Sequence, residues 1–263
     1  MKLLITNDDG IYAQGIQTLI KTMSSVAEIY VAAPDRERSG TGHSITVFEP
    51  IRAEQIEMPE VRVAWVIGGT PVDCVKLAVK KLIKTKIDLV VSGINHGPNL
   101  GTDILYSGTV AAAAEGVVLG IPSIAASLNS YSADADFTMA ADITKELIEQ
   151  ILRQGIEETT LLNINIPPLP REHIKGSRIT KLGIRNYDNL FEERKDPRGN
   201  AYFWLGGGVV IHRQEHNSDV TAVENGFLSI TPIHLDLTDY RLMEKYRQDL
   251  DGFLCPDNIS GLG

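Results

Sequence analysis

The sequence predicts an α/β protein built on a parallel, doubly wound sheet. Up to about residue 166, short apolar runs alternate with segments of helical periodicity, and this alternation is typical of βα units. Several of the runs consist almost entirely of Val, Ile, Leu and Ala, as expected of strands that are covered on both faces. The six predicted strands are residues 2–6, 28–33, 61–67, 87–94, 121–127 and 161–166.

The segments between these strands carry helix signals. Three of them show apolar residues at i, i+3, i+4 or i+7, namely Ile16, Leu19, Ile20 and Met23; Val75, Ala78, Val79 and Leu82; and Ile143, Leu147 and Ile151. The second begins with Thr70 as N-cap, Pro71 in the first turn and Asp73 at the third position. The third, residues 137–154, ends at Gly155. A helix of small residues is expected after Ser107.

The alternation ends in a proline-rich stretch after residue 166. We therefore divide the chain into a catalytic core, residues 1–166, and a β-rich extension, residues 167–263, which belongs to the same structural domain and has no catalytic function of its own. Strand-like segments at 178–184, 201–212 and 227–237, and a short charged helix near 239–250, are expected there. Gly206–Gly208 predict a bulge or bend, and residues 192–198 predict a solvated loop.

Charge and cysteine content narrow the classes of function. A net charge of −9 argues against binding to the phosphates of a nucleic-acid polymer, which needs a basic face. Small phosphorylated substrates remain compatible, because a bound cation reverses the local sign. The two cysteines, Cys74 and Cys255, lie far apart and favour a reducing compartment. The sequence carries no secretory signal and no apolar run near the ~20 residues of a membrane span, so we expect a cytoplasmic protein without a membrane partner.

Polar residues follow three of the predicted strands. The first strand ends in Asp8 and Asp9, the second leads into a loop with Ser39 and His43, and the fourth leads into the loop 92–110. Because ligands bind beyond the carboxyl ends of parallel strands, these loops belong to one rim. Two adjacent carboxylates are costly unless a cation lies between them, and Gly10 allows the sharp turn that follows.

The loop 92–110 predicts an anion site next to that carboxylate pair. It delivers Ser107, Gly108 and Thr109 to the start of a helix, where free backbone amides and the helix dipole attract phosphate. Asn95 lies in the same loop. The side chains available on the rim offer oxygen ligands, which suit Mg²⁺, Mn²⁺ or Ca²⁺ rather than zinc.

Simpler interpretations remain open for each motif alone. The acidic doublet could be an ordinary turn, and Ser107 could be no more than a helix N-cap. His43 and His96 are candidates for substrate contact, but histidines in such loops more often make structural hydrogen bonds. Cys74 on a helix face is expected to be buried in the core.

Taken together, these motifs resemble the SurE survival-protein family of metal-dependent 5′/3′-nucleotidases. The resemblance rests on "LLITNDDG" (3–10), "APDRERSGTGHSIT" (33–46), "GTPVDCV" (69–75), "DLVVSGINHGPNLGTDILYSGTVAAAAEG" (88–116), "GIPSIAAS" (120–127), "NINIP" (163–167) and "SDVTAVENGFLSITPIHLDLT" (218–238). It covers nearly the whole chain in order.

The resemblance implies a Rossmann-like three-layer α/β/α fold with a C-terminal β-hairpin and a tail exchanged between the subunits of a homodimer or homotetramer. It implies one divalent metal ion per subunit, held by Asp8, Asp9, Ser39 and Asn95. Phosphate contacts would come from Asn95, Ser107, Gly108 and Thr109. The substrates would be nucleoside 5′- and 3′-monophosphates, with short polyphosphate as a further one.

The hypothesis that follows is phosphohydrolysis by a metal-activated water, with Asp8 or Asp9, preferably Asp9, orienting or deprotonating that water. An aspartyl-phosphate mechanism is an alternative. A zinc-dependent deacetylase on a similar sheet would need His43 or His96 beside the acids. A receiver-like Mg²⁺-binding signalling module would need an Asp after the central strand, where this sequence has Asn95. A dinucleotide-binding dehydrogenase would need the GxGxxG spacing, which "TNDDGIYAQG" lacks.

Overall fold

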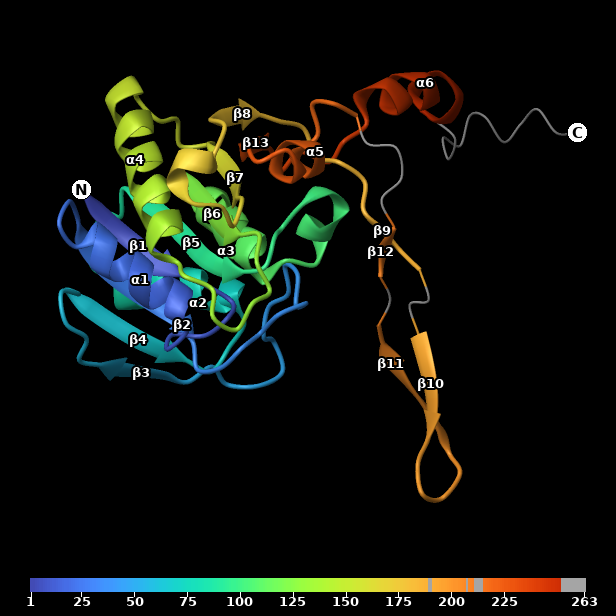
Figure 1. Cartoon of the computed structure of the whole chain (residues 1–263), viewed down its shortest axis with the longest axis horizontal. Coiled ribbons are helices and arrows are strands. Elements are labelled where there is room, and N and C mark those ends of the chain that lie inside the picture. Colours follow the sequence, from blue (N-terminus) through green and yellow to red (C-terminus); the bar gives the residue numbers. More distant parts are fainter. Residues whose placement is uncertain (189–190, 207, 211–214, 252–263) are drawn as a thin grey trace, which may run out of the picture. The chain divides into compact units, whose positions relative to one another are not determined.

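The computed structural model describes residues 1–188, 191–206, 208–210 and 215–251 (Figure 1). The central sheet of this part of the chain contains β1 (Lys2–Thr6), β2 (Glu28–Pro34), β3 (Ala53–Ile56), β4 (Val63–Ile67), β5 (Leu89–His96), β6 (Ser123–Leu128), β7 (Leu161–Ile166), β8 (Ser177–Ile179) and β13 (Leu228–Ile233). Their order across the sheet is β3-β4-β2-β1-β5-β6-β7-β13-β8. All six predicted strands are present, with starts that shift by at most two residues.

The sheet has its topological switch point between β1 and β5. The six strands from β4 to β7 run parallel, whereas β3 and β13 pair antiparallel with β4 and β7. From β1 the chain moves outward through β2 to β4, and then returns to β5 and moves outward in the other direction. The crevice outside the carboxyl ends of β1 and β5 is where such sheets bind ligands.

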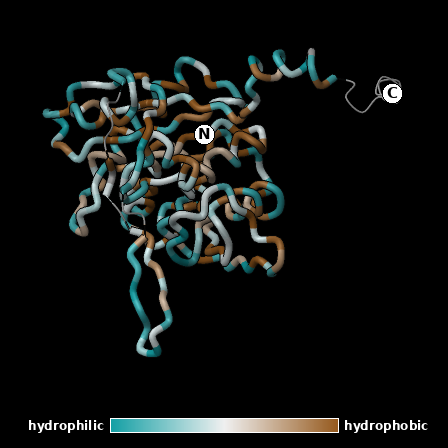
Figure 2. The backbone as a smooth tube through the Cα atoms, turned by 90° about the vertical axis from the view of Figure 1, so that its right-hand side faces the viewer, coloured by the Kyte–Doolittle hydropathy of each residue, from teal (hydrophilic) through white to brown (hydrophobic). Residues whose placement is uncertain are grey.

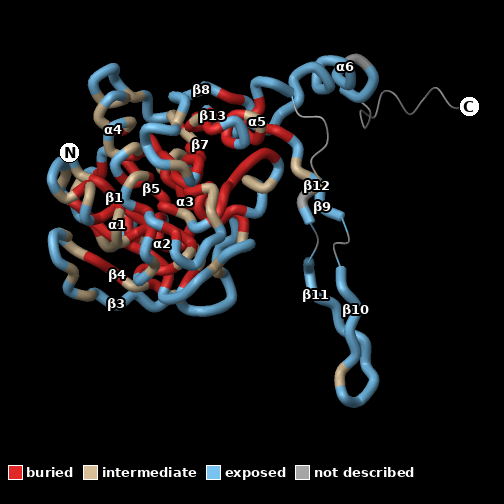
Figure 3. Tube along the Cα trace, in the orientation of Figure 1, coloured by how far each residue is buried: buried red, intermediate tan, exposed pale blue. Residues whose placement is uncertain are grey.

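Helices cover both faces of the sheet. One apolar cluster joins Leu3 and Ile5 of β1 to α1 (Gln14–Met23) and α4 (Thr138–Gln154). A second joins Leu4, on the opposite face of the same strand, to α2 (Pro71–Leu77) and α3 (Gly108–Val118). Successive side chains of a strand point to opposite faces, so β1 is buried on both sides. Figure 3 shows the buried residues concentrated in these strands and helices. The Rossmann-like three-layer α/β/α fold is confirmed.

The helix boundaries follow the signals in the sequence. Thr70 caps α2 by accepting the backbone N–H of Asp73, whose carboxylate accepts the backbone N–H of Thr70 in return. A π-helical turn, η1 (Ala78–Leu82), continues α2. α4 ends at Gly155, whose φ of +88° suits glycine. In α3, small residues allow the first nine positions to be buried between the sheet and α2.

Residues beyond 166 contribute to the central sheet and also form small separate elements. β8 and β13 extend the main sheet, while β9 (Asn186–Tyr187) pairs with β12 (Val209–Val210). β10 (Phe191–Lys195) and β11 (Ala201–Leu205) form an antiparallel hairpin. Figure 2 shows hydrophilic residues along one strand of this hairpin and more hydrophobic ones along the other. The remaining elements are η2 (Gly101–Leu105), η3 (Arg171–His173), α5 (Asp219–Glu224) and α6 (Tyr240–Leu250).

Several expectations for this part of the chain need correction. The prediction of a loop at 192–198 is wrong for residues 192–195, because cross-strand pairing with β11 makes this charged segment a strand. The strand predicted at 178–184 ends at Ile179 and the one at 227–237 ends at Ile233. The charged helix is confirmed as α6, in a second compact unit that begins at His234. The predicted bend at 206–208 and the strand end at 211–212 include residues outside the described ranges, and so does Cys255.

Cys74 is buried in α2, as predicted. None of the helices in the described ranges is both long and apolar enough to span a membrane.

Candidate functional site

The turn that follows β1 places the acidic doublet at the switch point. Asn7 is fully buried, and its side-chain Nδ2 donates to the Gly10 carbonyl at 2.9 Å. Gly10 has a φ of +98°, and a β-carbon there would lie 3.1 Å from the carbonyl carbon of Arg36. The turn therefore needs glycine, both for its backbone conformation and for its close approach to the loop after β2.

Asp8 is buried against the beginning of α3. Its Oδ1 accepts a hydrogen bond from the hydroxyl of Thr109, which is itself fully buried. A β-carbon on Gly108 would lie 2.8 Å from Asp8 Cβ and 2.9 Å from Asp8 Oδ2, so only glycine fits at that position. Ser107 caps α3 by accepting the backbone N–H of Val110 at 3.0 Å. The predicted phosphate segment and the predicted metal ligand are thus direct neighbours.

The two carboxylates are held in an environment that disfavours their negative charge. Burial raises the pKa of Asp8, and the hydrogen bond from Thr109 opposes this only partly. Burial, and then the charge of Asp8, raise the pKa of Asp9 to about 6. Glu37 adds a further negative charge that raises the pKa of both groups. A cation between the carboxylates would relieve this repulsion.

The other predicted ligands lie next to residues that contact the doublet. Asp9 Oδ2 accepts the backbone N–H of His96 at 3.1 Å, directly after Asn95. The carbonyl of Asp8 accepts the backbone N–H of Arg38 at 2.7 Å, directly before Ser39. Hydrogen bonds therefore join the turn that carries Asp8 and Asp9 to the loops that carry Ser39 and Asn95.

Asn95 and Ser39 have partners of their own in this structure. Asn95 Nδ2 donates to the Gly97 carbonyl at 2.8 Å. The Ser39 hydroxyl donates to Glu37 Oε1 at 2.8 Å, and Ser39 is exposed to solvent.

The rings of the two candidate histidines are hydrogen-bonded to residues outside the acidic doublet. His43 Nε2 lies 3.1 Å from Oε2 of the buried Glu115 on α3, and Glu115 also pairs with Lys76 at 3.1 Å. His96 Nε2 lies 2.9 Å from the Ser132 carbonyl, and its ring meets Phe137 edge-on. Contact of either ring with a substrate stays a prediction. These bonds do not favour the zinc deacetylase alternative, which needs one of the rings beside the acids.

The chemistry of the donors fits a hard divalent cation. Within the described ranges, no group of three or more His, Cys, Asp or Glu side chains is arranged to hold a metal ion. A site at the doublet would therefore combine two carboxylates with the neutral oxygens of Ser39 and Asn95. Oxygen donors of this kind suit Mg²⁺, Mn²⁺ or Ca²⁺.

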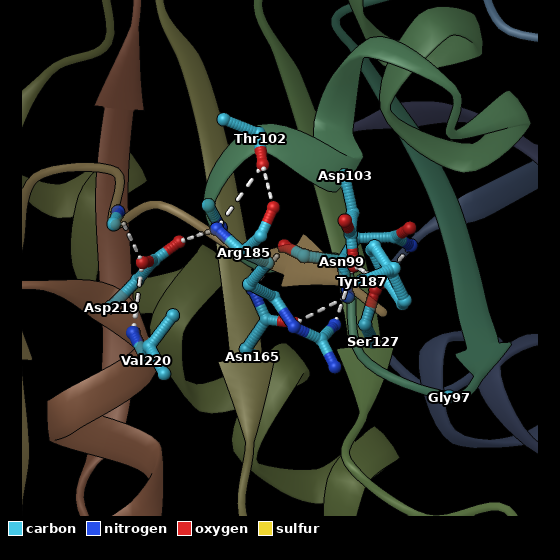
Figure 4. A network of polar contacts seen from close by, with 12 residues as sticks. Gly97, Asn99, Thr102, Asp103, Ser127, Asn165, Arg185, Tyr187, Asp219 and Val220 are labelled. Carbon is cyan, nitrogen blue, oxygen red and sulfur yellow. Dashed lines mark hydrogen bonds and ion pairs between the residues drawn. The ribbon is translucent and has the colours of Figure 1, made fainter. Parts of the chain in front are cut away.

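Buried polar contacts fix the loop between Asn95 and Ser107 (Figure 4). Asn99 is bound on three sides: its backbone N–H donates to Asn165 Oδ1 at 2.8 Å, its Nδ2 donates to Ser127 Oγ at 2.9 Å, and its carbonyl accepts bonds from Asn163 and Asn165. Asp219 at the start of α5 accepts the backbone N–H groups of Gly101, Gly183 and Val220. The loop is thus attached to β6, β7 and α5.

A second set of contacts joins the same loop to β9 and the residues before it. Asp103 Oδ2 accepts bonds from Arg185 Nη1 at 2.6 Å and from the Tyr187 hydroxyl at 2.5 Å. Thr102 Oγ1 donates to the Arg185 carbonyl at 2.9 Å (Figure 4). Burial and the bond to Asp103 raise the pKa of Tyr187 to about 12, so this hydroxyl stays a donor.

Sequence reasoning did not identify Asn99, Asn163, Asn165 or Asp219 as residues that position the site. A signal was present for two of them: Asn163 and Asn165 are polar residues at alternate positions of a buried strand, "LLNINI", and both face one side of the sheet. Buried polar side chains in a strand need partners, and the loop supplies them. The influence of Glu37 on Asp8 and Asp9 carried no such signal, because it depends on the path of an irregular loop.

The fold and the site together define an α/β protein with a buried carboxylate pair and a helix N-terminus at the switch point of a parallel sheet. Comparison with known proteins agrees with this class. The family described as Survival protein SurE matches residues 3–189. The chain belongs to the SurE survival-protein family, as the resemblance predicted.

Individual relatives cover almost the whole chain. A protein of Syntrophomonas wolfei named 5′-nucleotidase SurE is 64% identical, over 96% of each chain. A protein of the same name from Heliobacterium modesticaldum is 48% identical, over 97% of this chain and 94% of its own. The crystal structure of the SurE protein from Aquifex aeolicus superposes with a TM-score of 0.82 at 41% identity, over 94% of this chain and 99% of its own.

Proposed function

We propose that this protein is a 5′-nucleotidase, a phosphoric monoester hydrolase that releases phosphate from nucleoside 5′-monophosphates with the help of one divalent cation. The hydrolase class is supported by the name 5′-nucleotidase SurE, which relatives at 64% and 48% identity carry. The observation that carries the cation requirement is the buried doublet, in which the pKa of Asp8 and the pKa of Asp9 are both raised.

The proposed cation ligands are Asp8, Asp9, Ser39 and Asn95. When bound, the cation neutralises charge on the phosphate and lowers the pKa of a water molecule. Thr109 holds Asp8 through Oδ1, and this bond fixes the orientation of the carboxylate. Asn95 offers its amide oxygen, since its Nδ2 is bonded to Gly97.

The substrate phosphate is proposed to bind at the N-terminus of α3. The backbone N–H groups of Gly108 and Thr109 belong to the first turn of this helix, which leaves its amides without intrahelical acceptors. Gly108 lies against Asp8, so a phosphate bound there would lie beside a proposed ligand of the cation. Contacts of the phosphate with Asn95 and Ser107 belong to the same proposal.

Asp9 is the proposed general base. It is less buried than Asp8, and its Oδ2 is oriented by the backbone N–H of His96. In the proposed step, Asp9 orients the attacking water and accepts its proton as the water oxygen bonds to phosphorus. The P–O ester bond breaks, and the nucleoside oxygen takes a proton from solvent and leaves as an alcohol. Asp9 then returns its proton to solvent. The amides at the start of α3 stabilise the charge on the phosphoryl oxygens.

The remaining expectations also belong to this proposal. They are hydrolysis of 3′-monophosphates and short polyphosphate, use of Mg²⁺, Mn²⁺ or Ca²⁺, a cytoplasmic location, and a homodimer or homotetramer built by exchange of the C-terminal tail. We propose neither a nucleic-acid polymer nor a membrane as a partner, in keeping with the net charge of −9 and the apolar pattern.

The test is phosphate release from AMP by chelator-treated protein, before and after addition of Mn²⁺ or Mg²⁺. We expect activity to return with the metal and to fall by more than ~100-fold in Asp8→Asn and Asp9→Asn, because loss of a ligand exceeds the ~10–100-fold effect of losing a supporting residue. A matched control is Asp142→Asn, on the outer part of α4. Metal-independent release of phosphate, or full activity in both Asp variants, would contradict the proposal.

A further inference from the structure

The most exposed tyrosines of the protein surround the candidate site. Tyr12, Tyr106 and Tyr131 are 70%, 68% and 73% exposed, whereas the other five tyrosines are 60% exposed or less. Tyr12 follows the doublet after β1, Tyr106 directly precedes Ser107, and Tyr131 follows β6. All three therefore lie at the carboxyl edge of the sheet. Exposed aromatic surface that gathers around a polar site indicates a ligand with an apolar, planar part.

Tyr131 differs from an ordinary exposed side chain because its ring packs against Gly97. A β-carbon on Gly97 would lie 2.6 Å from Tyr131 Cε1 and 3.2 Å from Cδ1, so this edge of the ring lies close to the Gly97 backbone. Gly97 N–H also donates to the Leu128 carbonyl at 3.1 Å, which ties the two segments together. The ring thus packs against Gly97 at this edge, while Tyr131 as a whole stays largely exposed to solvent.

The same glycine connects Tyr131 to the proposed cation ligands. The Gly97 carbonyl accepts a hydrogen bond from Asn95 Nδ2. The preceding residue, His96, donates its backbone N–H to Asp9 Oδ2. Tyr187 lies close enough to Tyr131 for their hydroxyls to interact electrostatically, and its own hydroxyl is bonded to Asp103. Tyr131 is thus linked through Gly97 to the segment that carries Asn95, and through Tyr187 to the polar network of Figure 4.

We propose that Tyr131 is the platform on which the nucleobase of the substrate stacks. This inference rests on the proposed function, since it assigns the nucleoside part of the same substrate. A 5′-nucleotide whose phosphate lies at the start of α3 carries its base several ångströms away. Tyr131, an exposed ring that is linked to Asn95 through Gly97, is the proposed partner of that base. Stacking accepts every base because each base has a π-face, so Tyr131 selects for a nucleoside without selecting which one.

The first test is binding of adenosine, which lacks phosphate, to chelator-treated protein by isothermal titration calorimetry. Removal of a stacking partner costs ~1–3 kcal/mol per base, so Tyr131→Ala is expected to weaken adenosine binding about 5- to 150-fold. Tyr131→Phe keeps the ring and is expected to bind within about 2-fold of the original protein. Because Tyr131 is exposed, neither change should affect folding.

Tyr202→Ala is the control, because Tyr202 is also exposed but lies on β11, outside the central sheet. Unchanged binding in Tyr131→Ala, or an equal loss in Tyr202→Ala, would overturn the assignment. Steady-state kinetics distinguish it from the proposed function: Tyr131→Ala should raise KM for AMP while kcat/KM for glycerol 2-phosphate, which has no base, stays the same. An original protein that hydrolyses neither compound would refute the proposed function, whereas equal KM values for AMP would refute only the role of Tyr131.

Discussion

Asp8 and Ser39, both proposed ligands of one cation, differ in how the fold holds them. Asp8 follows a strand that is buried on both faces, and it is fixed by Thr109 and packed against Gly108. Ser39 lies in an exposed loop and bonds to the neighbouring side chain of Glu37. The difference teaches that the core presets the position of Asp8, whereas the position of Ser39 depends on an exposed loop. Changes around Asp8 should therefore matter far more than changes at Ser39.

The largest effect is expected from the charge on the doublet itself. In the metal-free protein the pKa of Asp9 is raised from 3.8 to about 6, so the folded state holds a proton that the unfolded chain loses between these pH values. Stability therefore falls as pH rises through this window, by up to about 3 kcal/mol. Asp8 contributes in the same direction, since its pKa is also raised.

Urea unfolding with a chelator, from pH 4 to pH 7, measures this loss. Asp9→Asn should remove the part that Asp9 contributes, so the free energies of unfolding of the two proteins should diverge as the pH rises. If the free energies of unfolding of the two proteins change in parallel across this pH range, Asp9 has an ordinary pKa and the prediction is wrong.

A steric change at α3 should have the next largest effect. In Gly108→Ala the new methyl group would lie 2.8–2.9 Å from the Asp8 side chain, which has to move. We expect the affinity for Mn²⁺ to fall ~10–100-fold, the range found when the support of a ligand is lost. Gly68→Ala is the control, since its β-carbon would meet its nearest atom, the Arg52 carbonyl oxygen, at 3.8 Å. Equal Mn²⁺ affinities in both variants would show that Asp8 has room to shift.

Removal of the hydrogen bond to Asp8 should have a smaller effect. Thr109→Val keeps the shape of the side chain but deletes the donor to Oδ1. We expect Mn²⁺ affinity to fall about 10-fold, and Thr109→Ser, which restores a hydroxyl, to recover most of it. If Thr109 instead serves only the phosphate, Mn²⁺ affinity will stay constant while KM for AMP rises.

The smallest effect is expected at the exposed loop. In Ser39→Ala, a water molecule can take the place of the hydroxyl, as waters commonly complete the shell of Mg²⁺ and Ca²⁺, so Mn²⁺ affinity should change less than about 5-fold. A loss as large as that in Gly108→Ala would mean that the two sides of the site are equally rigid.

The same contrast explains how much the sequence could predict. Strands, helices and the rim that carries Asp8, Asp9 and Asn95 follow from apolar periodicity, capping residues and the rule for parallel sheets. Each of these signals is local, or acts through the topology of the sheet. Thr109 and Asp8, which share a hydrogen bond, are 101 positions apart in the sequence. Tyr131 and Gly97, which are in contact, are 34 positions apart. No local sequence pattern can predict contacts over such distances.

In the extension after residue 166, the local composition led to a wrong prediction. Residues 192–195 are charged and exposed, which is typical of a loop, yet pairing with "AYFWL" makes them a strand. Pairing of this kind depends on the partner strand and not on the composition of the segment itself.

The central claim is that the carboxylate pair binds a divalent cation. The most direct measurement is calorimetric titration of Mn²⁺ into chelator-treated protein, with the double variant Asp8→Asn, Asp9→Asn alongside. We predict one Mn²⁺ per chain in the original protein and no binding in the folded double variant. Equal binding in both proteins would show that the cation lies elsewhere and would contradict the account.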